Sequence, residues 1–389
     1  MAPERFIASR LRFEGRMSAV AVAVSFFIMI LAVSVSSGFR SEIRSSIAGI
    51  SGDVMLTSRS MNYMAGDDLV HAPDAFLAVL DSMPEVTEVV PVIYRAGIVK
   101  TGSDVQGVIF KGVPGGEESS EEMVASIPTR LGEILALGPG DKMTAYFVGD
   151  KVKLRRFEIT SVYNEAVRTD DKMVVNVPLE VLRRLNDWNE GEVSAYEVML
   201  GDKFRGRKQM EEIASEIGFL SISMSSSDEE PLLARSAPQR YYRLFDWLDL
   251  IDLNVVVILI LMTVVAGFNM ISGLLILLFR NVSTIGTLKA MGMTDKGIAS
   301  VFQRLSSTLV LKGMAIGNAV ALLFCFLQGK THLLKLNPEN YFVSFVPVAV
   351  DIPLILIADA VAYVGIMLLL QIPCLFISKV DPAVTVATK

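Results

Sequence analysis

Cysteine is almost absent from this sequence of 389 residues, which contains only Cys325 and Cys374. Both lie in long apolar runs near the C-terminus. The large polar region that precedes these runs has no cysteine, so disulfide bonds are excluded as its stabiliser. A region of roughly 210 residues can bury an adequate core without them.

Histidine is equally scarce, with only His71 and His332 in the chain. Neither has a second histidine or a cysteine at the spacing of a metal site. We interpret both as surface or loop residues. The sequence predicts no metal site and no catalytic residues. It therefore gives little support to a membrane-tethered enzyme.

A phosphate-binding loop is also lacking. Gly292 and Gly297 have the spacing of a P-loop, but Ile298 and Ala299 stand where lysine and Ser/Thr would contact the phosphates. The segment also follows a helix-like stretch, whereas a P-loop follows a strand. We therefore expect no nucleotide and no other cofactor to be bound by this chain.

Charge is sparse for a chain of this length. Charged residues make up 20% and hydrophobic residues 52%, and the mean hydropathy is +0.48, which indicates a membrane protein. Four runs are long enough to cross a bilayer, which takes about 20 helical residues: 17–39, 253–279, 301–327 and 352–378. The first is longer than the core of a signal peptide and lacks a clear cleavage site, so we interpret it as a retained anchor.

Positive residues near these runs predict the orientation, because lysine and arginine favour the cytoplasmic side. They are Arg5, Arg10, Arg12, Arg16, Arg280, Lys289, Lys296, Arg304, Lys379 and Lys389. Both termini, including the tail 379–389, and the connector 280–300 are then cytoplasmic, and residues 40–252 and the loop 328–351 lie outside. Residues 1–16 place Phe6, Ile7, Leu11 and Phe13 on one arc, which is typical of an amphipathic helix on the inner membrane surface.

The outer region has the pattern of an α+β domain. "DAFLAVLDSM" predicts a helix, and "EVVPVIYRAGIVKTGSDVQGVIFKGV" predicts strands interrupted near Gly102. A second helix is expected in "RKQMEEIASEIGFLSISM", ending at Gly218 before a strand. A β-rich insertion, residues 126–195 approximately, interrupts the domain.

The connector 280–300 predicts a short amphipathic helix that fits a groove on another protein. Ser283 or Thr284 would cap it, and Gly292 would end it in the left-handed conformation. Ile285, Leu288 and Met291 would form the apolar side, with Lys289 exposed. Thr294 and Asp295 would begin the next helix. The alternative is a simple connector between two spans.

Two ionisable residues lie well inside predicted spans, away from the positive residues at their cytoplasmic ends. Lys312 and Asp359 lie at similar depths along their helices, and an ion pair between them would lessen the cost of burying each charge. The alternative is that each faces water or reaches the interface separately.

Several stretches, in their order and spacing, resemble one protein family. They are "FIASRLRF", "SVSSGFRSEIR", "GFRSEIRSSIAGISGDVMLTS", "GFNMISGLLILL" followed by "IGTLKAMGM", "NYFVSFVPV" and "KVDPAV". The chain resembles the permease subunits of ABC transporters in the FtsX-like and MacB superfamily, and most closely its lipoprotein-releasing LolC/LolE branch. The family usually has an acidic residue where this chain has Thr284, so we expect a different contact at that position.

This resemblance implies an α+β membrane protein of the bacterial inner membrane. Four transmembrane helices would carry a MacB-like periplasmic core domain between the first and second. The segment 280–300 would be the coupling helix, with Thr284, Ile285, Leu288, Lys289, Met291 and Gly292 facing a cytoplasmic ABC ATPase dimer that binds ATP and Mg.

The resemblance also implies the partners and the mode of action. A second permease, identical or paralogous, would complete the complex, and stalk helices at 39–49 and 240–250 would transmit motion that moves a lipoprotein to a periplasmic carrier. Acyl chains would enter between the first two spans, in contact with membrane lipids. The contact residues would be Phe26, Phe27, Met29, Met262, Phe268 and Met270. Ordinary lipid-facing or interhelical packing is the alternative for each, and no nucleic-acid partner is expected.

Two other functions fit the same resemblance. One is an FtsX-like scaffold that activates a cell-wall hydrolase without transport, and the other is a MacB-like exporter of a different substrate. The large outer domain favours lipoprotein release.

Overall fold

The structure is a computed structural model that describes residues 16–60, 69–102, 104–115, 123–149, 151–163, 173–225, 230–337, 341 and 343–375. Residues 1–15 of the predicted N-terminal amphipathic helix lie outside these ranges, and so does the predicted cytoplasmic tail. The chain divides into two compact units. We name them the helical unit (described residues within Met1–Ser41, Leu248–Lys335 and Phe345–Lys389) and the sheet unit (within Glu42–Trp247 and Leu336–Ser344).

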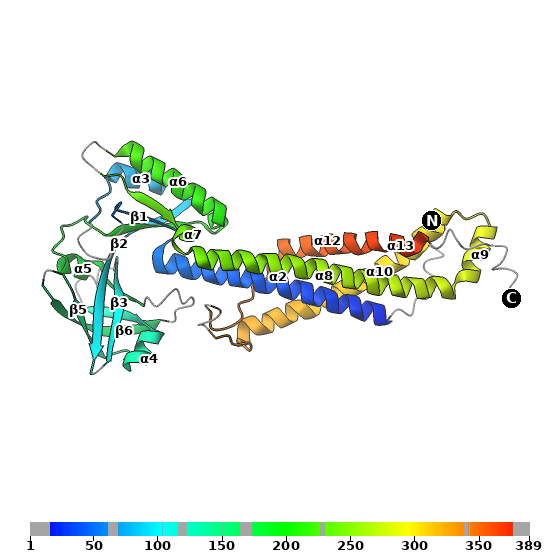
Figure 1. Cartoon of the computed structure of the whole chain (residues 1–389), viewed down its shortest axis with the longest axis horizontal. Coiled ribbons are helices and arrows are strands. Elements are labelled where there is room, and N and C mark those ends of the chain that lie inside the picture. Colours follow the sequence, from blue (N-terminus) through cyan, green and yellow to red (C-terminus); the bar gives the residue numbers. More distant parts are fainter. Residues whose placement is uncertain are drawn as a thin grey trace. The chain divides into compact units, whose positions relative to one another are not determined.

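Within the described residues, four helices are long and apolar enough to cross a membrane, as expected. They are α2 (Arg16–Ser51), α8 (Tyr242–Arg280), α10 (Asp295–Thr331) and α12 (Ile352–Leu369), and Figure 1 shows their order along the chain. The first two continue beyond the predicted spans. The fourth ends early and is followed by the short helix α13 (Gln371–Cys374), because Pro373 cannot donate to the carbonyl of Leu369 and its ring crowds that carbonyl.

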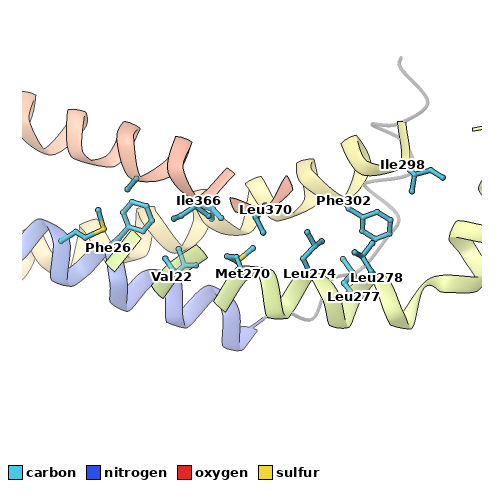
Figure 2. Packing of buried hydrophobic residues seen from close by; sticks show 14 of the residues in the cluster. Val22, Phe26, Met270, Leu274, Leu277, Leu278, Ile298, Phe302, Ile366 and Leu370 are labelled. Carbon is cyan, nitrogen blue, oxygen red and sulfur yellow. The ribbon is translucent and has the colours of Figure 1, made fainter. Parts of the chain in front are cut away.

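All four helices contribute to one apolar cluster in the helical unit. Val22 and Phe26 from α2, Met270 from α8, Phe302 from α10 and Ile366 from α12 are almost fully buried in it, and Figure 2 shows their side chains spread along the length of the helices. Lipid tails are as apolar as these side chains, so moving the side chains out of lipid into the cluster brings little hydrophobic free energy. Close packing must therefore hold the helices together.

Glycines allow α10 and α2 to approach closely. A Cβ on Gly313 would lie 2.8 Å from Cγ1 of Val22, and one on Gly317 would lie 3.0 Å from Cβ of Phe26 and closer still to the carbonyl oxygen of Ala23. This four-residue spacing of small residues is a common way to pack membrane helices. The glycines therefore serve contact within the chain.

Nine strands of the sheet unit form one network, in the order β3-β7-β4-β6-β5-β2-β8-β1-β9, with β3 also paired to β2. The strands are β1 (Val54–Thr57), β2 (Val86–Thr101), β3 (Asp104–Val113), β4 (Val124–Pro128), β5 (Lys142–Phe147), β6 (Lys153–Tyr163), β7 (Val174–Pro178), β8 (Ala195–Leu200) and β9 (Leu233–Ser236). Among the strand pairs formed by the described residues, only β3–β7 and β4–β6 run parallel.

The long strand β2 belongs to two parts of this network. Its first half pairs with β8, and its second half pairs with β3 and β5. The pairings from β3 through β7, β4, β6 and β5 return to β2, so six strands close into a barrel. Phe110, Phe147 and Phe157 fill its centre, with ring centroids 4.7 and 5.6 Å apart. The predicted β-rich insertion thus shares a strand with the rest of the domain.

Helices flank the strands of this unit. They are α3 (Asp74–Ser82), α4 (Thr129–Leu135), α5 (Leu179–Leu185), the 3-10 turn η1 (Asp202–Phe204), α6 (Arg207–Met224) and α7 (Ala237–Arg240). The predicted helix at "DAFLAVLDSM" is confirmed by α3.

The predicted break at Gly218 is wrong. Helix α6 continues to Met224, and Gly218 has no positive φ. The alternating residues after Gly218 suggested a strand, but buried Met210, Ile213 and Ile217 continue the helical spacing to Ser221. A Cβ on Gly218 would lie 3.7 Å from Cβ of Ala234, so a small residue suits the contact with β9.

Candidate functional site

The connector between α8 and α10 is a short helix, α9 (Val282–Ala290). Gly292 has φ +88°, as the sequence predicts, and the Thr294 hydroxyl accepts a hydrogen bond from the Gly297 N–H (3.2 Å) at the start of α10. The predicted N-cap is wrong. Ser283 and Thr284 lie inside the helix, and Asn281 precedes it with its side chain bonded to the Leu277 carbonyl (2.8 Å).

The apolar side of α9 turns inward. Ile285 is 1% exposed in the core cluster, Leu288 packs against that cluster, and only Met291 is exposed. Lys289 was expected to be exposed, but its side chain is mostly buried, and its ammonium pairs with Asp295 across the turn (2.9 Å). The predicted docking side is therefore mostly internal, since the apolar residues serve the core of the helical unit.

The outward face of α9 is polar and small. Its exposed residues are Ser283, Thr284, Thr287, Ala290 and Met291. At 3.6 residues per turn, Thr284, Thr287 and Met291 lie on one side of the helix. We name these three residues the α9 outer face; it is one exposed part of the connector that a partner protein can reach.

An apolar groove of about 720 Å³ lies between α2, α8 and α12 within the helical unit. Val33 on α2, Val256 and Ile260 on α8, and Ala358 and Val361 on α12 line its walls. This volume is within the usual range for small-molecule pockets, about 300–1,000 Å³. The groove can hold an extended apolar group.

Polar residues gather where Ser36 and Arg40 of α2 face Asp252 of α8, and they line the same groove. Arg40 forms an ion pair with Asp252, and the Ser36 hydroxyl donates to the other carboxylate oxygen (2.6 Å). Both charged side chains remain about one-third exposed, at 39% and 32%. The groove thus combines apolar walls with a charged, hydrogen-bonding region.

Of the six predicted acyl-contact residues, only Met29 lines this groove. Phe26 and Met270 are buried in the core cluster and Met262 packs against it. Phe268 is exposed, and Phe27 stacks edge-to-face on Phe324 with ring centroids 6.3 Å apart. The structure therefore brings four of the six together, Phe26, Met29, Met262 and Met270, but in the core cluster and not around the groove.

Sequence reasoning missed the α12 wall. Helices that are apolar all round carry no signal for which face packs inward, so residue size was the only available clue. Ala358, Ala362 and Gly365 on α12 recur at helical spacing, and such small residues leave space beside a helix.

The expected ion pair between Lys312 and Asp359 is not formed in the structure. Asp359 is buried and accepts a hydrogen bond from the Asn318 amide (2.5 Å). Lys312 is exposed and directly precedes buried Gly313, which places it about 100° around α10 from that glycine. Similar depth along two helices does not ensure that two residues share a face.

Neither histidine lies at a candidate site. His71 is exposed, and His332 is exposed at the end of α10 with its ring against Phe345 (4.1 Å between centroids). Within the described ranges, no group of three or more His, Cys, Asp or Glu side chains could hold a metal ion.

Comparisons with known proteins match both parts of the chain. Residues 256–382 match the FtsX-like permease C-terminal model, and residues 17–217 match the MacB-like periplasmic core domain. The lipoprotein-releasing system transmembrane protein LolE of Haemophilus influenzae is 21% identical over 368 residues, covering 86% of this chain and 84% of that protein.

The lipoprotein-releasing system transmembrane protein LolC of Neisseria meningitidis is 20% identical over 373 residues. The match covers 87% of this chain and 85% of that protein. Among solved structures, the periplasmic region of MacB from Actinobacillus actinomycetemcomitans covers 51% of this chain and 95% of that chain, with 13% identity and a TM-score of 0.33.

Proposed function

Because the chain belongs to the family of ABC transporter permeases with a MacB-like periplasmic core domain and an FtsX-like permease region, we propose that it releases lipoproteins from the bacterial inner membrane. Its similarity to LolE and LolC over most of the chain supports this substrate class. On this proposal the sheet unit is periplasmic and both termini are cytoplasmic.

The observation that carries the proposal is the groove between α2, α8 and α12. A lipoprotein anchor has long acyl chains joined to a polar end, and the groove offers apolar walls together with Ser36, Arg40 and Asp252. Acyl chains already lie in lipid, so moving them into an apolar groove brings little hydrophobic gain. We therefore assign selectivity to the polar residues and to the shape of the groove.

The energy for release would come from another subunit. Permeases of this kind work with a cytoplasmic ATPase and a second permease. The α9 outer face would contact the ATPase, which would hold ATP and Mg, and movement of α9 would pass through α8 and α10 because Ile285 and Leu288 pack into their shared core. The lipoprotein would then leave to a periplasmic carrier.

The test compares two identical substitutions on α12. Ala358 lines the groove, whereas Ala360 is exposed and does not. The chain is purified with its ATPase from host membranes, the partner is identified by mass spectrometry, and lipoprotein release to a carrier is measured after reconstitution. Ala358→Phe should fill the groove and lower release while the ATPase still co-purifies, and Ala360→Phe should release normally.

Equal release by both variants would remove the groove from the mechanism. A complex that releases no lipoprotein but activates a cell-wall hydrolase would support the FtsX-like scaffold instead. Export of an unrelated substrate, blocked by Ala358→Phe, would support a MacB-like exporter.

A further inference from the structure

Residues 50–53, at and just beyond the end of α2, are held by polar contacts from several parts of the sheet unit. We name these four residues the α2 collar. Its contacts are Ile50 carbonyl with Lys111 Nζ (2.8 Å), Ser51 hydroxyl with Tyr241 hydroxyl (2.9 Å), Gly52 carbonyl with Arg240 (2.6 Å), and Asp53 carboxylate with Arg205 (3.0 Å) and the Leu200 N–H (2.8 Å).

The centre of this arrangement is a buried ion pair. Lys111 on β3 and Glu197 on β8 have side chains only 5% and 1% exposed, with 2.8 Å between Nζ and Oε2. The Tyr94 hydroxyl on β2 donates to the other oxygen of Glu197. The hairpin β2–β3 and the distant strand β8 therefore each supply one or more members of this group, and Lys111 connects it to the end of α2.

Lys111 makes a contact that an ordinary ion pair would not require. Its ammonium also donates to the Ile50 carbonyl, and the last carbonyls of a helix lack partners within the helix. A positive charge there also suits the helix dipole. Lys111 thus fastens α2 to the sheet while it neutralises Glu197.

Gly52 permits this close approach. It has φ +65°, and a Cβ at this position would lie 2.9 Å from Cβ of Glu197. The chain can therefore turn directly over the buried carboxylate only with glycine at this position.

Stability alone does not explain a buried pair of this kind. Removing two charges from water is costly, and replacing such a pair with apolar residues is often neutral or stabilising. An apolar pair could fill the space, but it could not hold the Ile50 carbonyl. The contact to α2 is therefore what the charges add.

The same collar holds the start of the second long helix. Arg240 and Tyr241, which contact Gly52 and Ser51, directly precede α8 at Tyr242. Helices α2 and α8 each continue from the sheet unit into the helical unit.

We propose that the α2 collar is the joint through which movement of α2 and α8 is passed to the sheet unit, with Lys111 and Glu197 as positioning residues. The proposal rests on the proposed function, because it concerns how ATP-driven movement reaches the part of the chain that handles the released lipoprotein. It adds a specific buried pair whose role is to hold a helix end.

The test uses the full chain in reconstituted membranes with its ATPase. The double variant Lys111→Met with Glu197→Met removes the charges and keeps the volume. The matched control is Lys153→Met with Asp187→Asn, which removes the exposed ion pair Lys153–Asp187 (2.6 Å) in the same unit. Two quantities are measured: hydrogen exchange of the amides in residues 43–50, and lipoprotein released per ATP hydrolysed.

We expect the double variant to unfold as cooperatively as the wild type, to exchange these amides faster, and to release about five- to tenfold less lipoprotein per ATP, the lower range of coupling between distant sites. The control should change neither quantity. Unchanged exchange or unchanged release per ATP in the double variant would overturn the proposal.

A double variant that fails to fold is replaced by Tyr94→Phe, which removes a single hydroxyl contact and should give a smaller change in the same direction. No change with Tyr94→Phe would then count against the joint. If the wild type itself releases no lipoprotein, the proposed function fails, whereas the exchange comparison still decides whether Lys111 and Glu197 hold the end of α2.

Discussion

The two units bury their side chains against different surroundings. In the sheet unit, Phe110, Phe147 and Phe157 are at most 1% exposed inside a closed barrel. In the helical unit, α8 leaves Val257 and Ile260 56% and 61% exposed, as expected of a helix that faces lipid or another membrane helix. Water drives apolar side chains inward only in the first case, so the second unit depends on close fit.

Polar groups differ between the units in the same way. The sheet unit buries Lys111 and Glu197 with mutual and backbone partners. In the helical unit, Asp359 is buried with the Asn318 amide as its partner. The sheet unit thus buries an oppositely charged pair with further partners, whereas the buried carboxylate in the helical unit has an uncharged partner.

The largest effect should come from matched phenylalanine deletions in the two units. Phe110 and Phe26 are both 0% exposed. Phe110→Ala should lower the free energy of unfolding by about 3–5 kcal/mol. The variant loses the free energy gained by moving the ring out of water, and it leaves a cavity in the barrel. Phe26→Ala should cost clearly less, since the unfolded reference of a membrane helix is still in lipid. Urea and thermal unfolding of the full chain in nanodiscs measures both, and equal losses would contradict the comparison.

The next effect concerns fit between α2 and α10. Gly317→Leu should destabilise the helical unit by about 1–3 kcal/mol or more, because the added side chain must displace the α2 backbone. Gly329→Leu on the same helix is the control, since its Cβ would lie 3.7 Å from the nearest side chain, Val348. Thermal unfolding should separate the two variants; similar melting temperatures would show that the glycines are not needed for packing.

A smaller effect should appear at high pH. Burial and the neighbouring Glu197 carboxylate raise the pKa of Tyr94 well above its usual 10.0. The folded state therefore keeps the proton that the unfolded state loses, so this contribution is complete below about pH 10 and declines as the pH rises further.

The decline from one such group is at most about 1.4 kcal/mol per pH unit. Tyr94→Phe should flatten the dependence of unfolding free energy on pH above that point. Denaturant unfolding between neutral pH and pH 11 tests this, and an unchanged slope would remove Tyr94 from the linkage.

The smallest effect on stability should come from the α9 outer face. Thr287→Asp changes an exposed residue, and such changes usually stay within about 0.5 kcal/mol. It should nevertheless reduce co-purification of the ATPase, because a new charge would enter that contact. Leu288→Asp, by contrast, should destabilise the helical unit because Leu288 packs on the core cluster. Normal ATPase recovery with Thr287→Asp would contradict the proposed contact.

Local sequence patterns predicted several elements correctly. The four apolar helices, the helix at Asp74–Ser82, the turn at Gly292 and the start of α10 at Asp295 all follow from residues within a few positions of each other. The same local reasoning failed at Gly218, where an alternating stretch is compatible with both helix and strand, and the contact with β9 decides between them.

The candidate sites were less predictable. Ile285 and Leu288 were identified as an apolar side, but the sequence could not show that this side meets the core of its own chain. Acyl entry was predicted between the first two spans, and nothing in the sequence indicated that α12 would supply much of the wall of a groove beside them. Apolar residues on every face of a helix do not indicate an orientation.

By itself, the sequence determined that this is a membrane protein with four apolar helices, a cysteine-free α+β region and no phosphate-binding loop, because hydropathy, helical length and motif spacing are local properties. Only the tertiary structure decided which helix faces meet, where the groove lies, and that Lys111 and Glu197 are buried at the end of α2. Residues 50, 111 and 197 are far apart along the chain; the pairing of β3 and β8 with β2 brings Lys111 and Glu197 together, and the end of α2 must then lie against them for the Ile50 carbonyl to reach hydrogen-bond distance.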